Sequence, residues 1–179
     1  MGLQTKRCLP QLIVRSLSGH SQTGRLSLGH LSFPCALGRS GKVMRKSEGD
    51  GATPIGTFPL RYAFYRSDRM RRPATQLALR RLAPSSGWCD ASAHPRYNQF
   101  VRHPFPASAE RLWRDDQLYN VIVVIGHNDR PRRVSGGSAI FLHIARDGLK
   151  PTEGCIALRA SDMRKVLARL TPKTRIRIL

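Results

Sequence analysis

The segment Tyr119 to Ile125, which reads Tyr-Asn-Val-Ile-Val-Val-Ile, constrains the fold of this chain more than any other. It is short, rich in β-branched residues and apolar at nearly every position, so it predicts a β-strand that is buried on both faces. The longest apolar run of the chain, Val121 to Gly126, falls far short of the roughly 20 residues that span a bilayer. We therefore expect a β-rich protein with no transmembrane segment.

The other predicted strands are short segments with alternating or β-branched apolar residues. They are Leu12 to Leu17, Arg25 to Leu31, Thr57 to Tyr62, Gln76 to Leu82, Ala139 to Ala145 and Thr174 to Ile178. We expect a hairpin turn at Gly19 to Gly24 and a long loop over the glycine-marked stretch Gly38 to Gly56. Strands thus dominate the predicted fold.

One helix is predicted after Ser161, which is a suitable N-cap residue. Its apolar positions follow the helical repeat and are Met163, Val166, Leu167 and Leu170. Thr171-Pro172 should end the helix, because proline cannot continue it. A second short helix is predicted around Ser108 to Trp113, inside the irregular stretch Pro84 to Asp116. The predicted fold class is mostly β with one or two short helices.

The length of 179 residues suits one domain. Since the chain has no internal repeat or low-complexity linker, we divide it into an N-terminal extension, residues 1–11, and a single domain, residues 12–179. The apolar patch near the start is interrupted by Pro10, Gln11 and Arg15, and no small-residue cleavage site follows it. We therefore predict no signal peptide.

Basic residues outnumber acidic ones by 31 to 11, which gives a net charge of +20 at pH 7. Such a chain attracts polyanions. The basic residues are spread along the sequence, however, and the aromatic residues, at 7%, lie mostly away from the arginine runs. Nucleic-acid binding favours clustered basic residues with interleaved aromatics, so we expect no nucleic-acid partner. A basic surface that steers a carboxylate-rich substrate fits the charge better.

The four cysteines, Cys8, Cys35, Cys89 and Cys155, stand far apart. Zinc sites use closely spaced ligands, so the sequence predicts no metal site. A disulfide between two of the first three cysteines stays open, because connectivity cannot be read from sequence. The oligomeric state stays open as well.

The segment Gly137 to Leu158 carries the residues that cysteine catalysis needs. His143 lies near the end of an apolar strand, and Cys155 follows twelve residues later, directly after Gly154. An imidazole near a thiol can lower its pKa and take its proton, and backbone N–H groups around Gly154 can stabilise an oxyanion. A lone cysteine or histidine is more often a core residue. The spacing of the whole segment favours catalysis.

This segment resembles the catalytic motif of the L,D-transpeptidase catalytic domain (YkuD) family, which is a histidine followed after about a dozen residues by Ser/Thr-x-Gly-Cys and Ile or Val. The matching residues are His143, Thr152, Gly154, Cys155 and Ile156. Thr53 to Phe58 matches a second family signature, Thr-Pro-x-Gly-x-Phe. Three further segments resemble a compact proteobacterial branch: Gly87 to Asp90, Leu112 to Asp116 and Gly126 to Asp129. The resemblance extends from about Leu12 to Leu179.

The resemblance implies a β-sandwich-like fold with cysteine and histidine in one cleft, and no cofactor. Cys155 would attack the carbonyl between an L-centre and a D-centre of a peptidoglycan stem peptide, commonly after meso-diaminopimelate. A thioester would form, which an amine then resolves into a cross-link. His143 would be the general base and acid, the backbone carbonyl of Ile144 would orient its ring, and the Gly154 backbone would stabilise the oxyanion.

Two positions differ from the family pattern. Glu153 stands where many members have a second histidine, and Ala157 where many have an arginine, with Arg159 two residues further on. A carboxylate beside the thiol raises its pKa unless it is turned away or paired. We expect substrate contacts from Thr152, Glu153 and Arg159. His127 and Asn128 are expected to line the cleft in place of the missing histidine.

Two alternatives stay open. An L,D-carboxypeptidase or endopeptidase would use the same chemistry with water in place of the amine, and a non-catalytic wall-binding module would use none. The implied substrate lies outside the cytoplasmic membrane, so we expect the protein in the cell envelope or periplasm.

Overall fold

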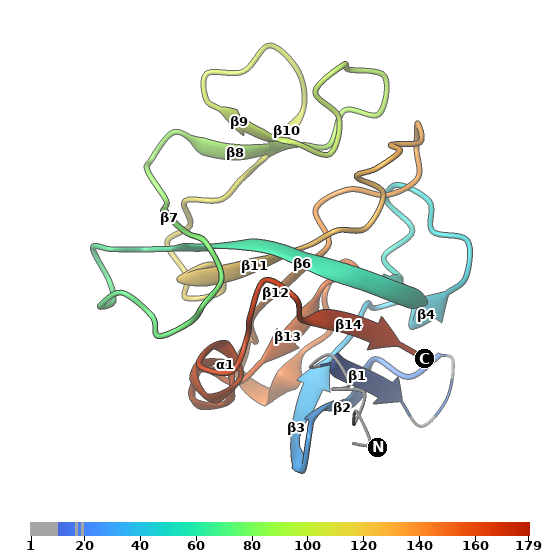
Figure 1. The fold of residues 1–179 in the computed structure, drawn as a ribbon. Coiled ribbons are helices and arrows are strands. Elements are labelled where there is room, and N and C mark those ends of the chain that lie inside the picture. Colours follow the sequence, from blue (N-terminus) through green and yellow to red (C-terminus); the bar gives the residue numbers. More distant parts are fainter. Residues whose placement is uncertain (1–10, 17, 19) are drawn as a thin grey trace, which may run out of the picture.

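The computed structural model describes residues 11–16, 18 and 20–179, and consists mostly of strands with one α-helix (Figure 1). The main sheet has nine strands, in the order β11-β12-β13-β3-β2-β1-β14-β6-β7. In chain order these strands are β1 (Gln11–Ser16), β2 (Thr23–Leu28), β3 (Leu31–Ala36), β6 (Gly56–Tyr65), β7 (Leu79–Arg81), β11 (Val121–Ile125), β12 (Phe141–Ile144), β13 (Ile156–Leu158) and β14 (Arg175–Ile178).

The main sheet closes on itself, because β11, at one end of the strand order, also pairs with β6. Two smaller sheets complete the strands: β10 (Ala109–Arg111) with β8 (Ser86–Cys89) and β9 (Phe100–Arg102), and β4 (Lys42–Val43) with β5 (Thr53–Pro54). The β8–β10 sheet covers the β11 side of the main sheet at the top of Figure 1. This layered arrangement confirms the predicted β-sandwich-like class.

β11 is buried on both faces, as its sequence predicts. Val121, Val123 and Ile125 belong to the large apolar cluster enclosed by the main sheet and α1 (Ala160–Leu167). Ile122 and Val124 point the other way, into a second cluster that contains residues of the β8–β10 sheet and of β12. A strand whose two faces both pack against protein has a near-continuous apolar sequence.

The helix forms where the sequence places it, but its N-terminus differs from the prediction. Its N-cap is Arg159, which makes no side-chain capping hydrogen bond, and Ser161 lies inside the first turn. Met163, Val166 and Leu167 are buried on its inner face, and Leu170 is buried just beyond it. A short 3₁₀ turn, η1 (Asp147–Leu149), is the second helical element.

Two predictions of secondary structure are wrong, one of a strand and one of a helix. The segment Arg25 to Leu31 is a hairpin rather than one strand: β2 ends at Leu28, and Gly29, at φ 59°, begins the turn into β3. The helix predicted over Ser108 to Trp113 is absent, because Ala109–Arg111 forms β10 and pairs with β8. Positive φ suits glycine, which explains the turn.

The remaining boundaries agree in part. β1 begins at Gln11, one residue before the predicted domain start, while Leu17 and Gly19 lie outside the described residues. The division into an extension and a domain stays a prediction.

Cys35 and Cys89 are both free, buried thiols, so no disulfide joins them, and Cys8 lies outside the described part of the chain. Within the described residues, α1 is too short and polar to cross a bilayer, and no longer apolar helix is found.

Candidate active site

The thiol of Cys155 lies at the point where the chain enters β13. β12 and β13 are parallel neighbours, and their register pairs Leu142 with Ile156 and His143 with Ala157. The sulfur accepts a hydrogen bond from the backbone N–H of Phe141 at 3.3 Å and donates one to the carbonyl of Ala139 at 3.2 Å. Strand pairing therefore fixes the cysteine beside the strand that carries the histidine.

His143 is buried on β12, with only 5% of its surface exposed. Its Nδ1 lies 2.8 Å from the backbone carbonyl of Ile144, the partner expected for it. The Tyr119 ring packs against the imidazole in a T-shaped arrangement, with ring centroids 5.2 Å apart. When Nδ1–H donates to the carbonyl, Nε2 carries the free lone pair, which is the tautomer that a general base needs.

Burial sets the protonation of both groups. It raises the pKa of the Cys155 thiol to about 12, and it lowers the pKa of His143 to about 4. The nearby Glu110 carboxylate also raises the thiol pKa, while the hydrogen bond from Phe141 lowers it. At neutral pH the pair is thus a neutral thiol and a neutral imidazole. The lowered thiol pKa that the sequence suggested is not found, because desolvation disfavours the thiolate.

Thr152 and Gly154 shape the turn that presents the cysteine. The Thr152 hydroxyl donates to the carbonyl of Cys155 at 2.7 Å and accepts from the N–H of Gly154 at 3.2 Å. Gly154 has φ 124°, and a Cβ there would lie 2.7 Å from the carbonyl oxygen of Ala52. Glycine is therefore required by both conformation and space. The oxyanion role of the Gly154 backbone stays a prediction.

Glu153 is turned away from the thiol. Its Oε2 accepts a hydrogen bond from Nε of Arg39 at 2.7 Å, and its side chain is 76% exposed. Its charge is the last and smallest of the influences that raise the pKa of Cys155. The ion pair thus offsets part of the penalty expected from a carboxylate beside the nucleophile.

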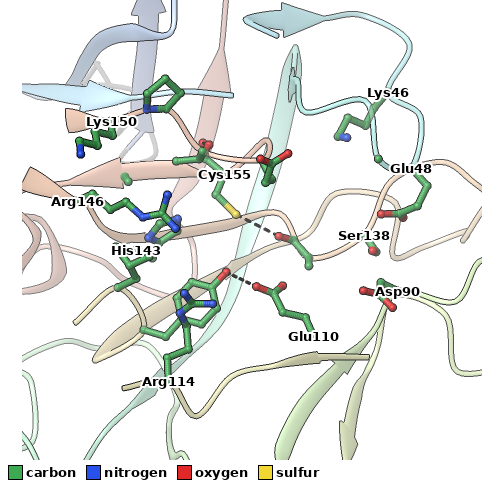
Figure 2. A pocket seen from close by; sticks show the side chains of 18 residues that line it. Lys46, Glu48, Asp90, Glu110, Arg114, Ser138, His143, Arg146, Lys150 and Cys155 are labelled. Atoms are coloured by element: carbon green, nitrogen blue, oxygen red, sulfur yellow. Dashed lines mark hydrogen bonds between the residues drawn. The ribbon is translucent and has the colours of Figure 1, made fainter. Parts of the chain in front are cut away.

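Cys155 and His143 line one cleft of about 470 Å³ (Figure 2). Thr152 and Glu153 line it too, together with Lys46, Glu48, Gly49, Asp90, Glu110, Arg114, Leu118, Tyr119, Ser138, Ala139, Arg146, Lys150, Pro151 and Ala157. In Figure 2 the basic side chains Arg114, Arg146 and Lys150 lie on the His143 side of the sulfur, and the carboxylates Glu48 and Asp90 lie on the other. The residues that line the cleft do not include the exposed Arg159.

His127 and Asn128 line a neighbouring pocket rather than the cleft of Cys155. His127 Nε2 lies 2.9 Å from the carbonyl of Gly136, and burial lowers its pKa. The Asn128 side chain donates to the carbonyls of Arg133 and Gly137, and its Oδ1 accepts from the N–H of Arg133. These contacts hold the loop that leads to Ala139, so both residues support the site from outside the cleft.

Sequence reasoning missed Asn98, a buried side chain that connects three segments. Its Oδ1 accepts from Nε1 of Trp88 at 2.9 Å and from the N–H of Ala139 at 3.2 Å. Its Nδ2 donates to the carbonyls of His127 and Asn128, at 3.0 and 2.9 Å. In the sequence it stands between Tyr97 and Gln99, inside the irregular stretch Pro84 to Asp116, and no motif marks it. Asn98 thus fixes Ala139, whose carbonyl accepts the hydrogen bond from the Cys155 thiol.

Across residues 11–16, 18 and 20–179, no three histidine, cysteine, aspartate or glutamate side chains are grouped as metal ligands would be.

Residues 21–178 match the family model of the L,D-transpeptidase catalytic domain, YkuD. No match was found among curated proteins. Among solved structures the chain is similar to L,D-transpeptidase 1 from Mycobacterium tuberculosis, with 16% sequence identity and a TM-score of 0.39. The alignment covers 94% of this chain and 62% of that one, so the chain spans less than two thirds of that protein. The match over residues 21–178 shows that the chain belongs to the L,D-transpeptidase catalytic domain family.

Proposed function

We propose that the protein is a peptidoglycan L,D-transpeptidase in which Cys155 forms a thioester with a stem peptide. The observation that carries the proposal is the placement of His143 on β12 and of Cys155 directly before the parallel neighbour β13, so that both line one cleft. The neutral imidazole, with Nδ1 engaged by Ile144, supports its role as the base. The family membership supports the substrate class.

In the first step, Nε2 of His143 takes the thiol proton as the sulfur of Cys155 bonds to the carbonyl carbon between the L-centre and the D-centre. The C–N bond then breaks, His143 returns the proton to the departing amine, and a thioester remains. Because both resting groups are neutral, proton transfer accompanies the attack instead of preceding it. The backbone N–H of Gly154 is the proposed oxyanion donor. In the structure it donates a 3.2 Å hydrogen bond to the Thr152 hydroxyl.

In the second step, an amine attacks the thioester carbonyl and loses its proton to His143. The C–S bond breaks, an amide forms, and Cys155 regains its proton. Water in place of the amine gives net hydrolysis, which is the carboxypeptidase or endopeptidase outcome. No cofactor takes part in either route.

The charged side chains of the cleft support an anionic substrate. Arg146 and Lys150 are exposed on the His143 side of the sulfur, where the departing D-residue must lie to receive a proton from His143. A terminal carboxylate there would be attracted by both side chains. Thr152 and Glu153 are the other proposed substrate contacts, together with Arg159 at the rim. The substrate places the protein in the cell envelope or periplasm.

The experiment is incubation of the purified protein with tetrapeptide-containing muropeptides, followed by mass spectrometry. A cross-linked dimer that is lost in Cys155→Ala supports transpeptidation, whereas tripeptide with free D-alanine and no dimer supports hydrolysis. Cys89→Ala is the matched control, since Cys89 is another buried free thiol but does not line the cleft. No product with a wild-type protein that still binds the muropeptides would reject the enzymatic proposal and leave the wall-binding module.

A further inference from the structure

The pocket that His127 and Asn128 line has a volume of about 650 Å³ and shares Lys46 with the cleft of Cys155. Its walls come from two loops, one between β4 and β5 and one between β11 and β12. These loops lie side by side at the right of Figure 1, where the N–H of Glu48 donates to the carbonyl of Ser135 at 2.9 Å. Together they present one surface, which we call the loop patch and define as residues 44–45 and 130–134.

The loop patch carries three positive charges without a counter-charge. Among the residues that the structure describes, no ion pair involves its three exposed arginines that line the pocket, which are Arg45, Arg130 and Arg133. The described lining of the pocket contains no acidic residue. Two aspartates of the same loops already have partners, because Asp50 pairs with Lys46 and Asp129 pairs with Arg61. Such a surface attracts an anionic partner.

Two large apolar side chains project from the same loops. Met44 lines the pocket and Val134 directly follows Arg133, and their surfaces are 81% and 75% exposed. In the described part of the chain, these are the two exposed large apolar residues. One exposed apolar residue is ordinary on a protein surface. Two of them on adjoining loops, among unpaired arginines, indicate a surface that meets negative charge and an apolar phase together.

Hydrogen bonds hold the loop that carries Val134. The Asn128 side chain makes three of them with the backbone of this loop. Nη1 of Arg132 donates to two backbone carbonyls in the segment between β8 and β9, at 3.1 and 2.8 Å. Because the loop is already ordered, its binding to a partner loses little conformational entropy.

We propose that the loop patch docks the protein on the surface of a bilayer that contains anionic phospholipids. Its guanidinium groups would donate paired hydrogen bonds to headgroup phosphates, whose geometry arginine fits. Met44 and Val134 would enter the boundary between headgroups and acyl chains. Basic residues and inserted apolar groups together give stable attachment where either alone is weak. Since Lys46 lines both pockets, the cleft of Cys155 would open beside the membrane surface.

The first test is sedimentation of the purified protein with vesicles of phosphatidylcholine and phosphatidylglycerol in equal parts, at physiological ionic strength. We expect binding to these vesicles and little binding to pure phosphatidylcholine. Arg130→Gln/Arg133→Gln should weaken binding about thirtyfold, from roughly fivefold for each basic residue near an anionic surface. Arg71→Gln/Arg72→Gln is the matched control, because it removes the same charge from two exposed arginines in the loop after β6, at the left of Figure 1. It should bind nearly as well as the wild-type protein.

The second test measures insertion. Lipids with bromine on their acyl chains should quench the tryptophan emission of Val134→Trp. The emission of the wild-type protein should change little, since Trp88 is buried and Trp113 is half-buried. Met44→Ser/Val134→Ser should bind the mixed vesicles about tenfold more weakly, in line with the loss of two buried apolar side chains.

Equal losses in the two arginine double variants would overturn the proposal, because basic charge anywhere on the surface would then suffice. Binding of Val134→Trp without quenching would also reject it, since the patch would not enter the bilayer. If Arg130 and Arg133 support binding to isolated wall sacculi and not to vesicles, the patch binds wall polymer and the proposal is wrong. Thermal unfolding of each variant shows that a loss of binding does not come from a lost fold.

The docking proposal goes beyond the proposed function and is tested separately from it. Cys155→Ala should bind the mixed vesicles as the wild-type protein does, because the loop patch lies outside the cleft. The muropeptide assay decides the reaction whatever the vesicles show.

Discussion

Nε of Arg39 lies 2.7 Å from Oε2 of Glu153, and this ion pair turns the carboxylate next to the nucleophile outward, to 76% side-chain exposure. The two residues are 114 positions apart in the sequence. The pair is positioned by two bonds between the loops that carry it: the N–H of Arg39 donates to the carbonyl of Thr152, and the N–H of Thr152 donates to the carbonyl of Leu37. The loop after β3 therefore controls the charge beside Cys155.

Arg39→Ala should slow acylation of Cys155 by a few-fold. Without its partner, Glu153 is free to approach the sulfur, and a nearby negative charge raises the thiol pKa further. The measurement is the rate of thioester formation at Cys155 with a donor peptide, followed by intact-protein mass spectrometry. Glu153→Gln in the Arg39→Ala background should restore the rate. A double variant as slow as Arg39→Ala alone would show that Arg39 acts in another way.

The folded protein should lose stability as the pH falls from 6.5 to about 4, partly through His143. Its pKa is lowered by burial to about 4, so the unfolded chain binds the proton first and the folded state is disfavoured across that window. The contribution of His143 to the loss in the free energy of unfolding should be about 3 kcal/mol, from 1.36 kcal/mol per pKa unit. Urea unfolding at several pH values measures it. His143→Gln should show a shallower pH dependence, with the remainder including buried His127, whose pKa is lowered too. If the free energy of unfolding falls equally steeply with pH in the wild-type protein and in His143→Gln, His143 is not buried in its neutral form.

Alkylation of Cys155 in the substrate-free protein should be slow at neutral pH and should keep rising above pH 9. A thiol whose pKa is raised to about 12 is protonated below that pH, and only the thiolate reacts. Iodoacetamide labelling, mapped by peptide mass spectrometry, gives the rate at each pH. A small thiol with an ordinary pKa serves as the reference, and its rate should level off above about pH 9. A plateau for Cys155 at neutral pH would mean that the site stabilises the thiolate.

Asn98→Ala should destabilise the fold by about 3 kcal/mol, since it leaves buried donors and acceptors in three segments unpaired. It should also slow acylation, because Ala139 loses the bond that fixes its carbonyl against the thiol. Chemical unfolding and adduct formation measure the two effects. Trp88→Phe, which removes only one of the donors, should be destabilised by about 1 kcal/mol. Similar losses in the two variants would contradict the connecting role of Asn98.

Local sequence patterns predicted the elements whose packing is local or two-sided. β11 is apolar because both faces are buried, and the helix after Arg159 has its apolar residues on one face. β3 was missed because Ser32 and Pro34 interrupt its apolar residues. It becomes a strand through its partners, β2 on one side and β13 on the other. The strand conformation of that segment therefore depends on pairing with distant parts of the chain.

The residues of the site also divide into those that a local motif predicts and those that only the fold brings together. His143, Gly154 and Cys155 lie in one short motif, so their spacing made them predictable, and the parallel pairing of β12 with β13 explains that spacing. Arg39, Asn98 and the carboxylates of the cleft come from distant segments, and only the folded chain brings them together. His127 and Asn128 were expected in the cleft as a replacement for the histidine that Glu153 displaces, but their side chains hold the following loop instead.

The closure of the main sheet has a consequence for the protein in a crowded solution. With β11 paired to both β6 and β12, every strand of that sheet within the described residues has a neighbour on each side except β7. Unpaired strand edges invite another molecule to add its own strand, which leads to aggregation. β7 is three residues long and carries exposed Arg80 and Arg81, so two copies meeting along it would bring like charges together. The main sheet is thereby protected from pairing with the main sheet of another copy edge to edge.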